Sequence, residues 1–558
     1  MQIRLRSTSY LLPENSSWNY LKKNNKLDFA EYNNIFSETY IKKNVECEVF
    51  IFFLRDLFDY YLNDKKNIDI KKIKILISTL KKIISSNKEK YYIISLSSYF
   101  YSNVINETKN LSKEVDLENF FYKELYKLSN YLPNIYILNI DKAFAYHGYK
   151  ECFDERNFSL FKCRLSVLGI EVLSKKINTI VESFHQTSKK VLLLDCDNTI
   201  WGGVIGEDGI EKIKLGQDGL GTSFKNFQKA IKKIKNNGVL ICLVSKNNKN
   251  DVIDVLKNHK SMVLKEKDIS SLKINWKSKS ENIKEISKEL FLSLDSFVFW
   301  DDNPIERNKI KSEIEEVEVI EPDSDVSNWS KQLLEYKGFS KFKITTEDKK
   351  KTKQYKLRSL FIEDKTSSKS EIEYLKKIKL LPKLDVIKKD NIDRAEQLLL
   401  KTNQFNFSVK RYKSSQLKNM NINYNCNLIK LTDIYGDHGH VGLIIYKVLK
   451  KKYVLVDTFL MSCRIMGRYL ENWILHQLQI FAKKKKVSKI LFECNLNKKN
   501  IELINQFIKL NNLKKYSSLQ LTKLFKETKI KINKNLLYMF DTKTKIKKLE
   551  IYKNNKLN

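Results

Sequence analysis

Hydrophobic residues in the middle of the chain form short unbroken runs, separated by longer amphipathic segments. The runs read KVLLLD, GVLICLVS and SFVFWDD, at residues 190–195, 238–245 and 296–302. Such runs are typical of strands that helices cover on both faces. Between them, residues 223–238 and 280–291 space their apolar side chains three and four positions apart, as amphipathic helices do. The pattern predicts a doubly wound parallel sheet.

The two flanks also alternate between strand and helix patterns, less regularly. The N-terminal flank has a helical pattern at residues 71–86 and strand-like runs at 91–99 and 134–140, which predicts an α/β unit. The C-terminal flank has strand patterns at 427–435, 440–449, 452–461 and 489–494, with a helical pattern at 470–486. Between centre and C-terminal flank, residues 341–372 are highly charged, and we expect a solvated connecting helix with a loop.

Polar side chains follow the central strands at the points where they end. Asp195, Ser245, Asp301 and Asp302 occupy these positions. Because the carboxyl ends of parallel strands line one crevice, we expect these groups to meet in one pocket. Asp197 lies one residue from Asp195, and two such carboxylates repel unless a cation or a proton separates them. The sequence therefore predicts a cation site.

A lysine precedes the second amphipathic helix, and two residues compete for its role. Lys277 and Lys279 both lie in the segment KSKSENI. We favour Lys279, because it immediately precedes Ser280, which we expect to cap the helix.

The D-x-D-x-T run at residues 195–199, the later Ser and Lys and the final Asp pair resemble the ordered motifs of the haloacid dehalogenase superfamily of phosphotransferases. The resemblance implies an aspartyl-phosphate on Asp195 and general acid and base catalysis by Asp197. It implies Mg²⁺ held by Asp195, the backbone carbonyl of Asp197, one or both of Asp301 and Asp302, and waters. Ser245 and Lys279 would hold the phosphoryl oxygens. No large insertion separates these motifs, so we expect an uncapped site that admits a macromolecule.

Further segments, LDCDNTIWGGVIGEDG and FLMSCRIMGRYLE among them, are similar to the FkbH-like family. The resemblance implies an SGNH-hydrolase-like domain at residues 1–185, without a recognisable Gly-Asp-Ser nucleophile and expected to be non-catalytic. It implies a capless haloacid dehalogenase-like domain at 189–335, a charged linker at 336–372 and an acetyltransferase-like (GNAT) α+β domain at 373–545. The fold class expected for the whole chain is α/β.

The same family resemblance implies an activity. Its members remove phosphate from 1,3-bisphosphoglycerate, a small phosphorylated acyl donor, and deliver a glyceryl group as a thioester to an acyl carrier protein. Two alternatives stay open: a plain phosphatase without acyl transfer, and a carrier-binding scaffold in polyketide or surface-polysaccharide biosynthesis.

A thioester route requires a thiol, and two cysteines are candidates. Cys196 lies between the two catalytic carboxylates, which should raise its thiol pKa and oppose a covalent role. Cys463 is followed by Arg464 and Arg468, which we expect to favour a thiolate, although a buried structural cysteine is an equal alternative.

A phosphopantetheine arm is expected to bind near the same C-terminal segment. The acetyltransferase pattern R/Q-x-x-G-x-G/A reads Arg464 to Tyr469, and Tyr469 replaces the small residue that lets a pyrophosphate approach the helix. Acetyl-CoA binding is therefore in doubt. The candidate arm-binding residues are Arg464, Gly467, Arg468 and the nearby His438.

Composition narrows the setting and the partners. Lys and Arg number 103 against 66 Asp and Glu, a net charge of +37 that is spread along the whole chain. We interpret the excess as compositional drift rather than a nucleic-acid-binding surface, and it suits an acidic protein partner. Eight scattered cysteines without a CxxC pair, and no apolar segment of membrane-spanning length, predict a cytoplasmic protein with no membrane partner.

Overall fold

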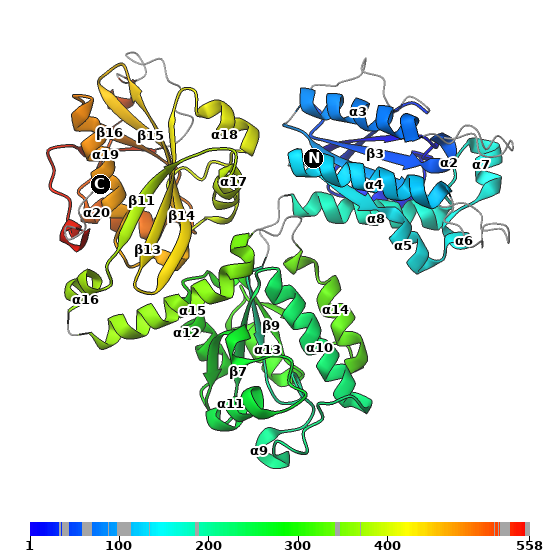
Figure 1. Ribbon diagram of the computed structural model, residues 1–558, viewed down its shortest axis with the longest axis horizontal. Helices are drawn as coiled ribbons and strands as arrows, with labels where there is room; N and C mark the ends of the chain where they lie inside the picture. The colour runs from blue at the N-terminus through cyan, green and yellow to red at the C-terminus, as the bar shows by residue number, and fades with distance from the viewer. Residues whose placement is uncertain are drawn as a thin grey trace. The chain divides into compact units, whose positions relative to one another are not determined.

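The computed structural model divides the chain into two compact units, Met1–Gln186 and Thr187–Asn558 (Figure 1). It describes residues 1–32, 35, 44–57, 70–87, 89–97, 113–132, 134–184, 189–340, 346–368, 370–517, 519–522, 524 and 536–552. Each unit has its own sheets and its own hydrophobic cores. The two units are therefore described separately.

The N-terminal unit is a parallel sheet with helices on both faces. Its five strands run in the order β2-β1-β3-β4-β5. They are β1 (Gln2–Ser7), β2 (Lys26–Phe29), β3 (Cys47–Phe53), β4 (Tyr91–Ser97) and β5 (Ile135–Asn139). The helices are α1 (Asn19–Lys22), α2 (Leu54–Leu57), α3 (Ile70–Ser86), α4 (Lys113–Tyr131), α5 (Ile140–His147), α6 (Tyr149–Cys152), α7 (Glu155–Phe161) and α8 (Val167–Ser183).

Side-chain alternation along β3 explains the two faces of this sheet. Val49 and Ile51 enter one core with residues of α5 and α8, whereas Phe50 and Phe52 enter another with residues of α3 and α4. The predicted α/β character of this flank is therefore present. Its SGNH-like assignment stays a prediction.

The central part of the second unit is a parallel sheet in the order β10-β9-β6-β7-β8. Its strands are β6 (Val191–Leu194), β7 (Leu240–Ser245), β8 (Ile269–Ile274), β9 (Phe297–Trp300) and β10 (Glu318–Ile320). Its helices are α9 (Ile205–Asp208), α10 (Gly219–Asn236), α11 (Lys249–Asn258), α12 (Lys279–Leu290), α13 (Pro304–Glu313) and α14 (Trp329–Glu335). Residues of β6, β7 and β9 alternate between two cores, one with α10, α11 and α14 and one with α12 and α13.

The expectation of a solvated connecting helix is wrong in one respect. Helix α15 (Thr346–Ser367) lies in the charged segment, but Tyr355, Arg358 and Phe361 are at most 5% exposed. Tyr355 packs in a core of the central sheet, and Phe361 packs in the core of the C-terminal sheet. One side of the helix is buried because it packs against both sheets. Its many charged residues obscure the spacing of the few apolar ones, so the sequence pattern did not predict this burial.

The C-terminal part is built on a mixed sheet in the order β11-β13-β14-β15-β16-β18-β17, with β12 paired to β15. The strands are β11 (Leu381–Val386), β12 (Phe405–Asn406), β13 (Asn425–Asp433), β14 (Gly436–Leu449), β15 (Tyr453–Met461), β16 (Lys489–Cys494), β17 (Lys514–Lys515) and β18 (Leu536–Asp541). The helices are α16 (Glu371–Lys377), α17 (Ile392–Lys401), α18 (Ser414–Met420), α19 (Leu470–Lys484) and α20 (Ile501–Leu510). All pairs are antiparallel except β15 with β16, which α19 connects.

Candidate active site

Three carboxylates meet at the carboxyl edge of the central sheet. Asp195 follows β6, and Asp301 and Asp302 follow β9, the strand that pairs with β6. One oxygen of each carboxylate lies within 4.8 Å of the others. The parallel register that aligns Leu194 with Trp300 produces this arrangement, because it ends both strands at the same level.

The Lys279 ammonium group lies among these carboxylates. Its Nζ is 2.6 Å from Asp301 Oδ2 and 3.1 Å from Asp195 Oδ1, and its side chain is 4% exposed. Burial lowers the pKa of Lys279, but Asp195 and Asp301 together raise it above the ordinary value. The rival Lys277 instead pairs with the half-exposed Glu285 at the surface.

The expected cap of α12 is wrong by two residues. Ser278 precedes the helix with an extended backbone, and its hydroxyl accepts a hydrogen bond from the Glu281 amide. Ser280 is already the second residue of the helix, so it does not occupy the position before the first turn from which a side chain caps. Lys279 is consequently the first helical residue, which directs it from the helix start toward the acids.

Crowding of like charges perturbs the acids themselves. Burial raises the pKa of Asp301, and the Asp195 carboxylate raises it further, against the effect of Lys279. Burial likewise raises the pKa of Asp302. The Thr199 hydroxyl donates a hydrogen bond to the Asp302 carboxylate at 2.8 Å, which opposes this rise only in part. Buried carboxylates that share one ammonium group fit a site for a divalent cation with oxygen ligands.

The Asp197 carboxylate lies outside this group of three and is held by donors of its own. Trp201 Nε1 donates to Oδ1 at 2.9 Å, the Ile205 amide donates to the same oxygen at 3.1 Å, and Asn247 Nδ2 donates to Oδ2 at 2.8 Å. Burial raises the pKa of Asp197, and the hydrogen bonds from Ile205, Trp201 and Asn247 oppose the rise. Such a carboxyl group suits proton transfer.

Sequence reasoning missed three residues that arrange the site. Trp201 and Asn247 orient Asp197, and Arg307 Nη1 donates to the carbonyls of Asp301 and Asp302 at 2.8 and 2.6 Å. All three lie within the conspicuous segments DNTIWGG, LVSKNN and WDDNPIER. The available signal was a donor side chain a few residues after Asp197 and after Asp301, for Trp201 and Arg307, and directly after the Ser245 strand end, for Asn247.

The side chains of Ser245 and Cys196 contact each other next to the acid cluster. Ser245 ends β7, is 2% exposed, and its hydroxyl hydrogen-bonds the Cys196 thiol. Cys196 is fully buried, and burial, with the charges of Asp195 and Asp197, raises its thiol pKa far above the ordinary value. This environment opposes the role of Cys196 as a thioester carrier, as the sequence suggested.

The C-terminal candidates for arm binding have partners inside the protein. Arg468 Nε and His438 Nε2 contact the Asp433 carboxylate at 3.0 and 2.9 Å, and the Arg468 guanidinium covers the Phe361 ring. Arg464 donates to Gln354 Oε1 and to the His438 carbonyl. These three candidates are at most 6% exposed.

The remaining two positions lie at the start of α19. Gly467 has a φ of +88°. Tyr469, the N-cap residue of α19, is in the left-handed region, and its hydroxyl donates to Glu371. The tyrosine thus takes the N-cap position, while its side chain is held by Glu371 and does not cap the helix.

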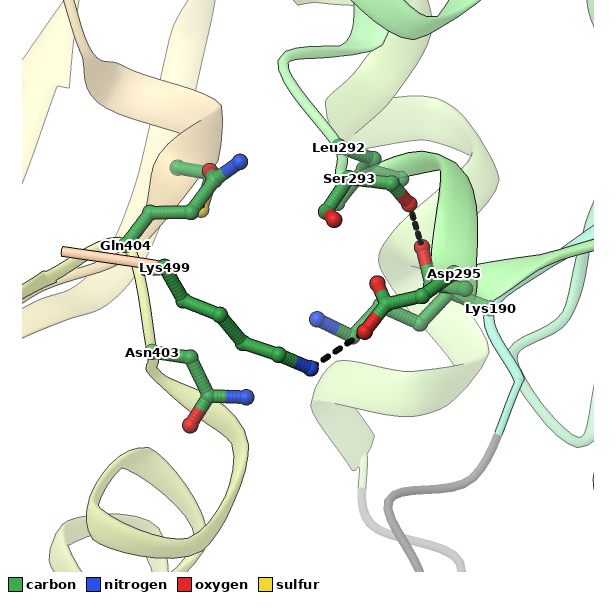
Figure 2. A pocket seen from close by; sticks show the side chains of 9 residues that line it. Lys190, Leu292, Ser293, Asp295, Asn403, Gln404 and Lys499 are labelled. Carbon is green, nitrogen blue, oxygen red and sulfur yellow. Dashed lines mark hydrogen bonds and ion pairs between the residues drawn. The ribbon is translucent and has the colours of Figure 1, made fainter. Parts of the chain in front are cut away.

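Cys463 lines a pocket, shown in Figure 2, with Lys190, Leu292, Ser293, Asp295, Ser296, Asn403, Gln404 and Lys499. Its Sγ lies 2.8 Å from Gln404 Oε1. The expectation that Arg464 and Arg468 favour a thiolate is wrong, because both guanidinium groups have other partners. Burial raises the pKa of Cys463, and the charges of Lys190 and Arg358 lower it only in part.

This pocket and the acid cluster lie at opposite edges of the central sheet. Lys190 precedes β6 and Ser296 precedes β9, whereas the acids follow the same two strands. The four residues of β6 separate the two edges by about 13 Å. At this separation a chemical group bound to Asp195 cannot pass directly to Cys463.

Comparison with known proteins adds one informative likeness. No protein-family profile and no curated protein sequence matches the chain at a significant level. The chain is similar to a crystal structure of the N-terminal part of protein BF1531 from Bacteroides fragilis, described as containing a phosphatase domain complexed with Mg. The identity is 26% and the TM-score 0.52, over 60% of this chain and 93% of that one. This likeness supports a haloacid dehalogenase-like phosphatase; the narrower FkbH-like resemblance stays a prediction.

The C-terminal part has weaker likenesses. A GNAT-family acetyltransferase from Staphylococcus aureus matches 29% of this chain and 99% of its own, with 13% identity and a TM-score of 0.23. The predicted α/β fold class is confirmed by the sheets themselves, two parallel and one mixed. Among the described residues, no helix is both long and apolar enough to cross a membrane.

Proposed function

We propose that the central domain is a Mg²⁺-dependent phosphatase or phosphotransferase. The observation that carries the proposal is the convergence of Asp195, Asp301 and Asp302 around Lys279. Two buried carboxylates and a third that is partly buried exceed the charge of one ammonium group, so a hard divalent cation fits the donor set. The bacterial phosphatase domain to which the chain is similar was crystallised with Mg.

The residues of the chain divide the reaction between them. Mg²⁺ held by Asp195, Asp301, Asp302 and the Asp197 carbonyl supplies charge neutralisation for an incoming phosphate. The Asp195 carboxylate attacks phosphorus, and the bond from phosphorus to the leaving oxygen breaks as Asp197 gives that oxygen its proton. Asp197 then takes a proton from water, whose oxygen attacks phosphorus, releasing phosphate and restoring Asp195. Ser245 and Lys279 bind phosphoryl oxygens.

Phosphate release from p-nitrophenyl phosphate tests this function. We expect activity that requires Mg²⁺, disappears with a chelator and returns with added Mg²⁺. The variant Asp195→Asn keeps the shape of the side chain but loses the nucleophile, so it should fall to background. Wild-type activity in Asp195→Asn, or activity indifferent to the metal, would contradict the proposal.

We further propose that dephosphorylation is coupled to acyl transfer. The donor is 1,3-bisphosphoglycerate, and the acceptor is the phosphopantetheine thiol of an acyl carrier protein. The thiol attacks the acyl carbonyl and the 1-phosphate leaves, while hydrolysis through Asp195 removes the 3-phosphate, so that the carrier holds a glyceryl thioester. The FkbH-like sequence resemblance supports this step, and the net charge of +37 suits an acidic partner. All eight cysteines are free, which supports a reducing, cytoplasmic setting. Nucleic acid and membrane have no part in the proposal.

The edge-to-edge separation restricts how Cys463 takes part. An acyl group at the acid site cannot pass directly to Cys463, because the length of strand β6 separates them. We therefore place any glyceryl thioester on Cys463 after release from the Asp195 site. The arm-binding roles of Arg464, Gly467, Arg468 and His438 remain part of this proposal.

Mass spectrometry of the carrier tests the coupling. The protein, Mg²⁺, 1,3-bisphosphoglycerate and a phosphopantetheinylated carrier are mixed, and we expect a glyceryl mass increase that Asp195→Asn abolishes. Phosphate release without the mass increase would leave a plain phosphatase. Carrier binding with neither reaction would leave a scaffold.

A further inference from the structure

We propose that the pocket between the central and C-terminal domains binds a small hydroxycarboxylate, held by Lys190, Asn403 and Gln404 next to Cys463. This pocket is separate from the acid cluster, and the proposal does not depend on the proposed acyl transfer. It rests on the hydrogen-bonding groups that face the pocket.

The pocket has one wall from each domain. Lys190, Ser293 and Asp295 belong to the central domain, whereas Asn403 and Gln404 belong to the C-terminal domain. The pocket has a volume of about 440 Å³, which is enough for a small molecule. Figure 2 shows the side chains of Lys190, Asn403 and Gln404 pointing into the gap between the two walls.

The two amide side chains present their nitrogen atoms to the pocket. Arg411 Nη2 donates to Asn403 Oδ1 at 2.6 Å, and the Cys463 thiol donates to Gln404 Oε1 at 2.8 Å. These bonds occupy the amide oxygens and so fix which way each amide faces. Within the described part of the chain, neither Asn403 Nδ2 nor Gln404 Nε2 has an acceptor, so both are free to donate to a ligand.

Lys190 adds a positive charge to the opposite wall. The Asp295 carboxylate in that wall pairs with Lys499, and no acid among the described residues forms an ion pair with Lys190. Two lysines and one aspartate leave the pocket with one positive charge in excess. A partly enclosed site with such an excess favours a ligand that carries one negative charge.

The carbonyl groups of the central-domain wall already accept hydrogen bonds. The Leu292 carbonyl accepts from Ser287 Oγ at 2.7 Å, and the Ser293 carbonyl accepts from Ser296 Oγ at 2.7 Å. The Ser296 carbonyl accepts from the Lys190 amide at 2.7 Å. The pocket therefore offers more free donors than free acceptors, which selects a ligand rich in acceptor oxygens.

These features together select a carboxylate that also carries hydroxyl groups. Its single negative charge offsets the Lys190 ammonium group. The free donors come from both walls, so a carboxylate bound at one wall leaves donors at the other wall for neighbouring hydroxyl oxygens to satisfy. A ligand bound in this way contacts both domains and lies beside the Cys463 thiol.

The Cys463 thiol offers a direct test of occupancy. All eight cysteines are described, and Cys463 alone is partly exposed, whereas the other seven are buried. Iodoacetamide should therefore alkylate Cys463 first in the full-length protein, which peptide mass spectrometry measures. Saturating glycerate, with a chelator present to keep metal from the acid cluster, should slow this alkylation about fivefold or more, because an occupied pocket excludes the reagent. Glycerol, which has hydroxyl groups but no charge, should not protect.

Titration calorimetry of glycerate with variants tests the residues. Lys190→Met removes the charge, and Asn403→Asp keeps the acceptor for Arg411 but places a carboxylate where the free donor was. Each should weaken glycerate binding about tenfold or more, since a hydrogen bond to a charged group is lost or replaced by repulsion. Lys498→Met removes an exposed lysine next to Lys499 and should change binding by less than about twofold. Thermal unfolding without ligand checks that each variant is folded.

The outcomes decide the proposal independently of phosphate release and carrier acylation. Equal protection by glycerol, or unchanged glycerate binding in Lys190→Met, would overturn the charged contact on which the site rests. Tighter binding of inorganic phosphate than of glycerate would overturn the choice of a carboxylate. Protection by glycerate in a protein that acylates no carrier would support this pocket while the proposed acyl transfer fails.

Discussion

One lysine offsets the repulsion between the clustered carboxylates. Lys279 Nζ is the ammonium group that lies between Asp195 and Asp301. Two residues away, Lys277 has the same side chain but contacts Glu285 at the surface. Lys277 therefore serves as a control position for substitutions of Lys279.

Lys279→Met should reduce phosphate release by about a hundredfold or more, because it removes a positive charge from where the phosphoryl group gains negative charge. It should also destabilise the central domain by about 3 kcal/mol when Mg²⁺ is absent, since buried carboxylates lose their partner. Lys277→Met should match wild type within twofold in steady-state kinetics and in denaturant unfolding. Equal effects of the two substitutions would refute the role of Lys279.

Trp201→Phe should lower kcat about tenfold with little change in KM. The ring that fills the core is kept, but the hydrogen bond to Asp197 worth about 1 to 1.5 kcal/mol is lost. Trp329→Phe is the control, because Trp329 is also buried and donates its Nε1 hydrogen bond to the Asp323 carbonyl. A drop of similar size in both variants would mean that Trp201 acts through packing alone.

At the scale of elements, an ion pair between Asp433 and Arg468 connects the end of β13 to the loop before α19. Asp433 is fully buried with Arg468 and contacts His438. Asp433→Asn should destabilise the C-terminal domain by about 3 to 5 kcal/mol, because the Arg468 guanidinium stays buried without its counter-charge. Asp437→Asn, on the exposed part of β14, should cost less than about 1 kcal/mol in urea unfolding.

The same pair predicts a dependence on acid. Burial tends to raise the pKa of Asp433, but His438 and Arg468 hold it below the ordinary value. A lowered pKa means that Asp433 stabilises the fold above about pH 3.9, its unfolded value, and that this contribution is lost as the pH falls further. Thermal unfolding between pH 6 and pH 3 should therefore show a steeper loss below pH 4 in wild type than in Asp433→Asn. Parallel curves would assign the acid sensitivity elsewhere.

Elements with strong patterns were predictable from sequence, and the reason is physical. The apolar runs of β6, β7 and β9 and the spacing in α10 and α12 reflect burial that local sequence must satisfy. Ser278 was missed as the cap because Ser278 and Ser280 are both acceptable caps, and only the backbone distinguishes them. Strands β8 and β10, which lie at the two edges of the sheet, have less continuous apolar patterns and were not predicted.

The candidate site was predictable in its acids and not in its supporting contacts. Asp195, Lys279, Asp301 and Asp302 come from motifs whose order places them at strand ends, and the structure brings them together. The prediction of a thiolate at Cys463 was wrong, because residues that are close in sequence need not direct their side chains toward one another. Arg464 and Arg468 follow Cys463 closely, yet their guanidinium groups turn to Gln354 and Asp433.

At the scale of the whole second unit, α15 connects the central and C-terminal sheets. Arg358 on this helix donates to the Glu289 carbonyl at the end of α12 and to the Arg464 and Met466 carbonyls beside α19. It is 4% exposed, and burial lowers its pKa to about 10. One guanidinium thus satisfies carbonyl groups from two domains.

Arg358→Met should uncouple the unfolding of these two domains. Loss of hydrogen bonds from a buried charged donor to three carbonyls costs about 3 kcal/mol, most of it in contacts that cross from one domain to the other. Calorimetry should then resolve one transition more than in wild type, with the new one displaced downward by several degrees. Lys353→Met, on the exposed side of α15, should leave the wild-type profile. An unchanged unfolding profile in Arg358→Met would show that apolar packing of Tyr355 and Phe361 alone joins the domains.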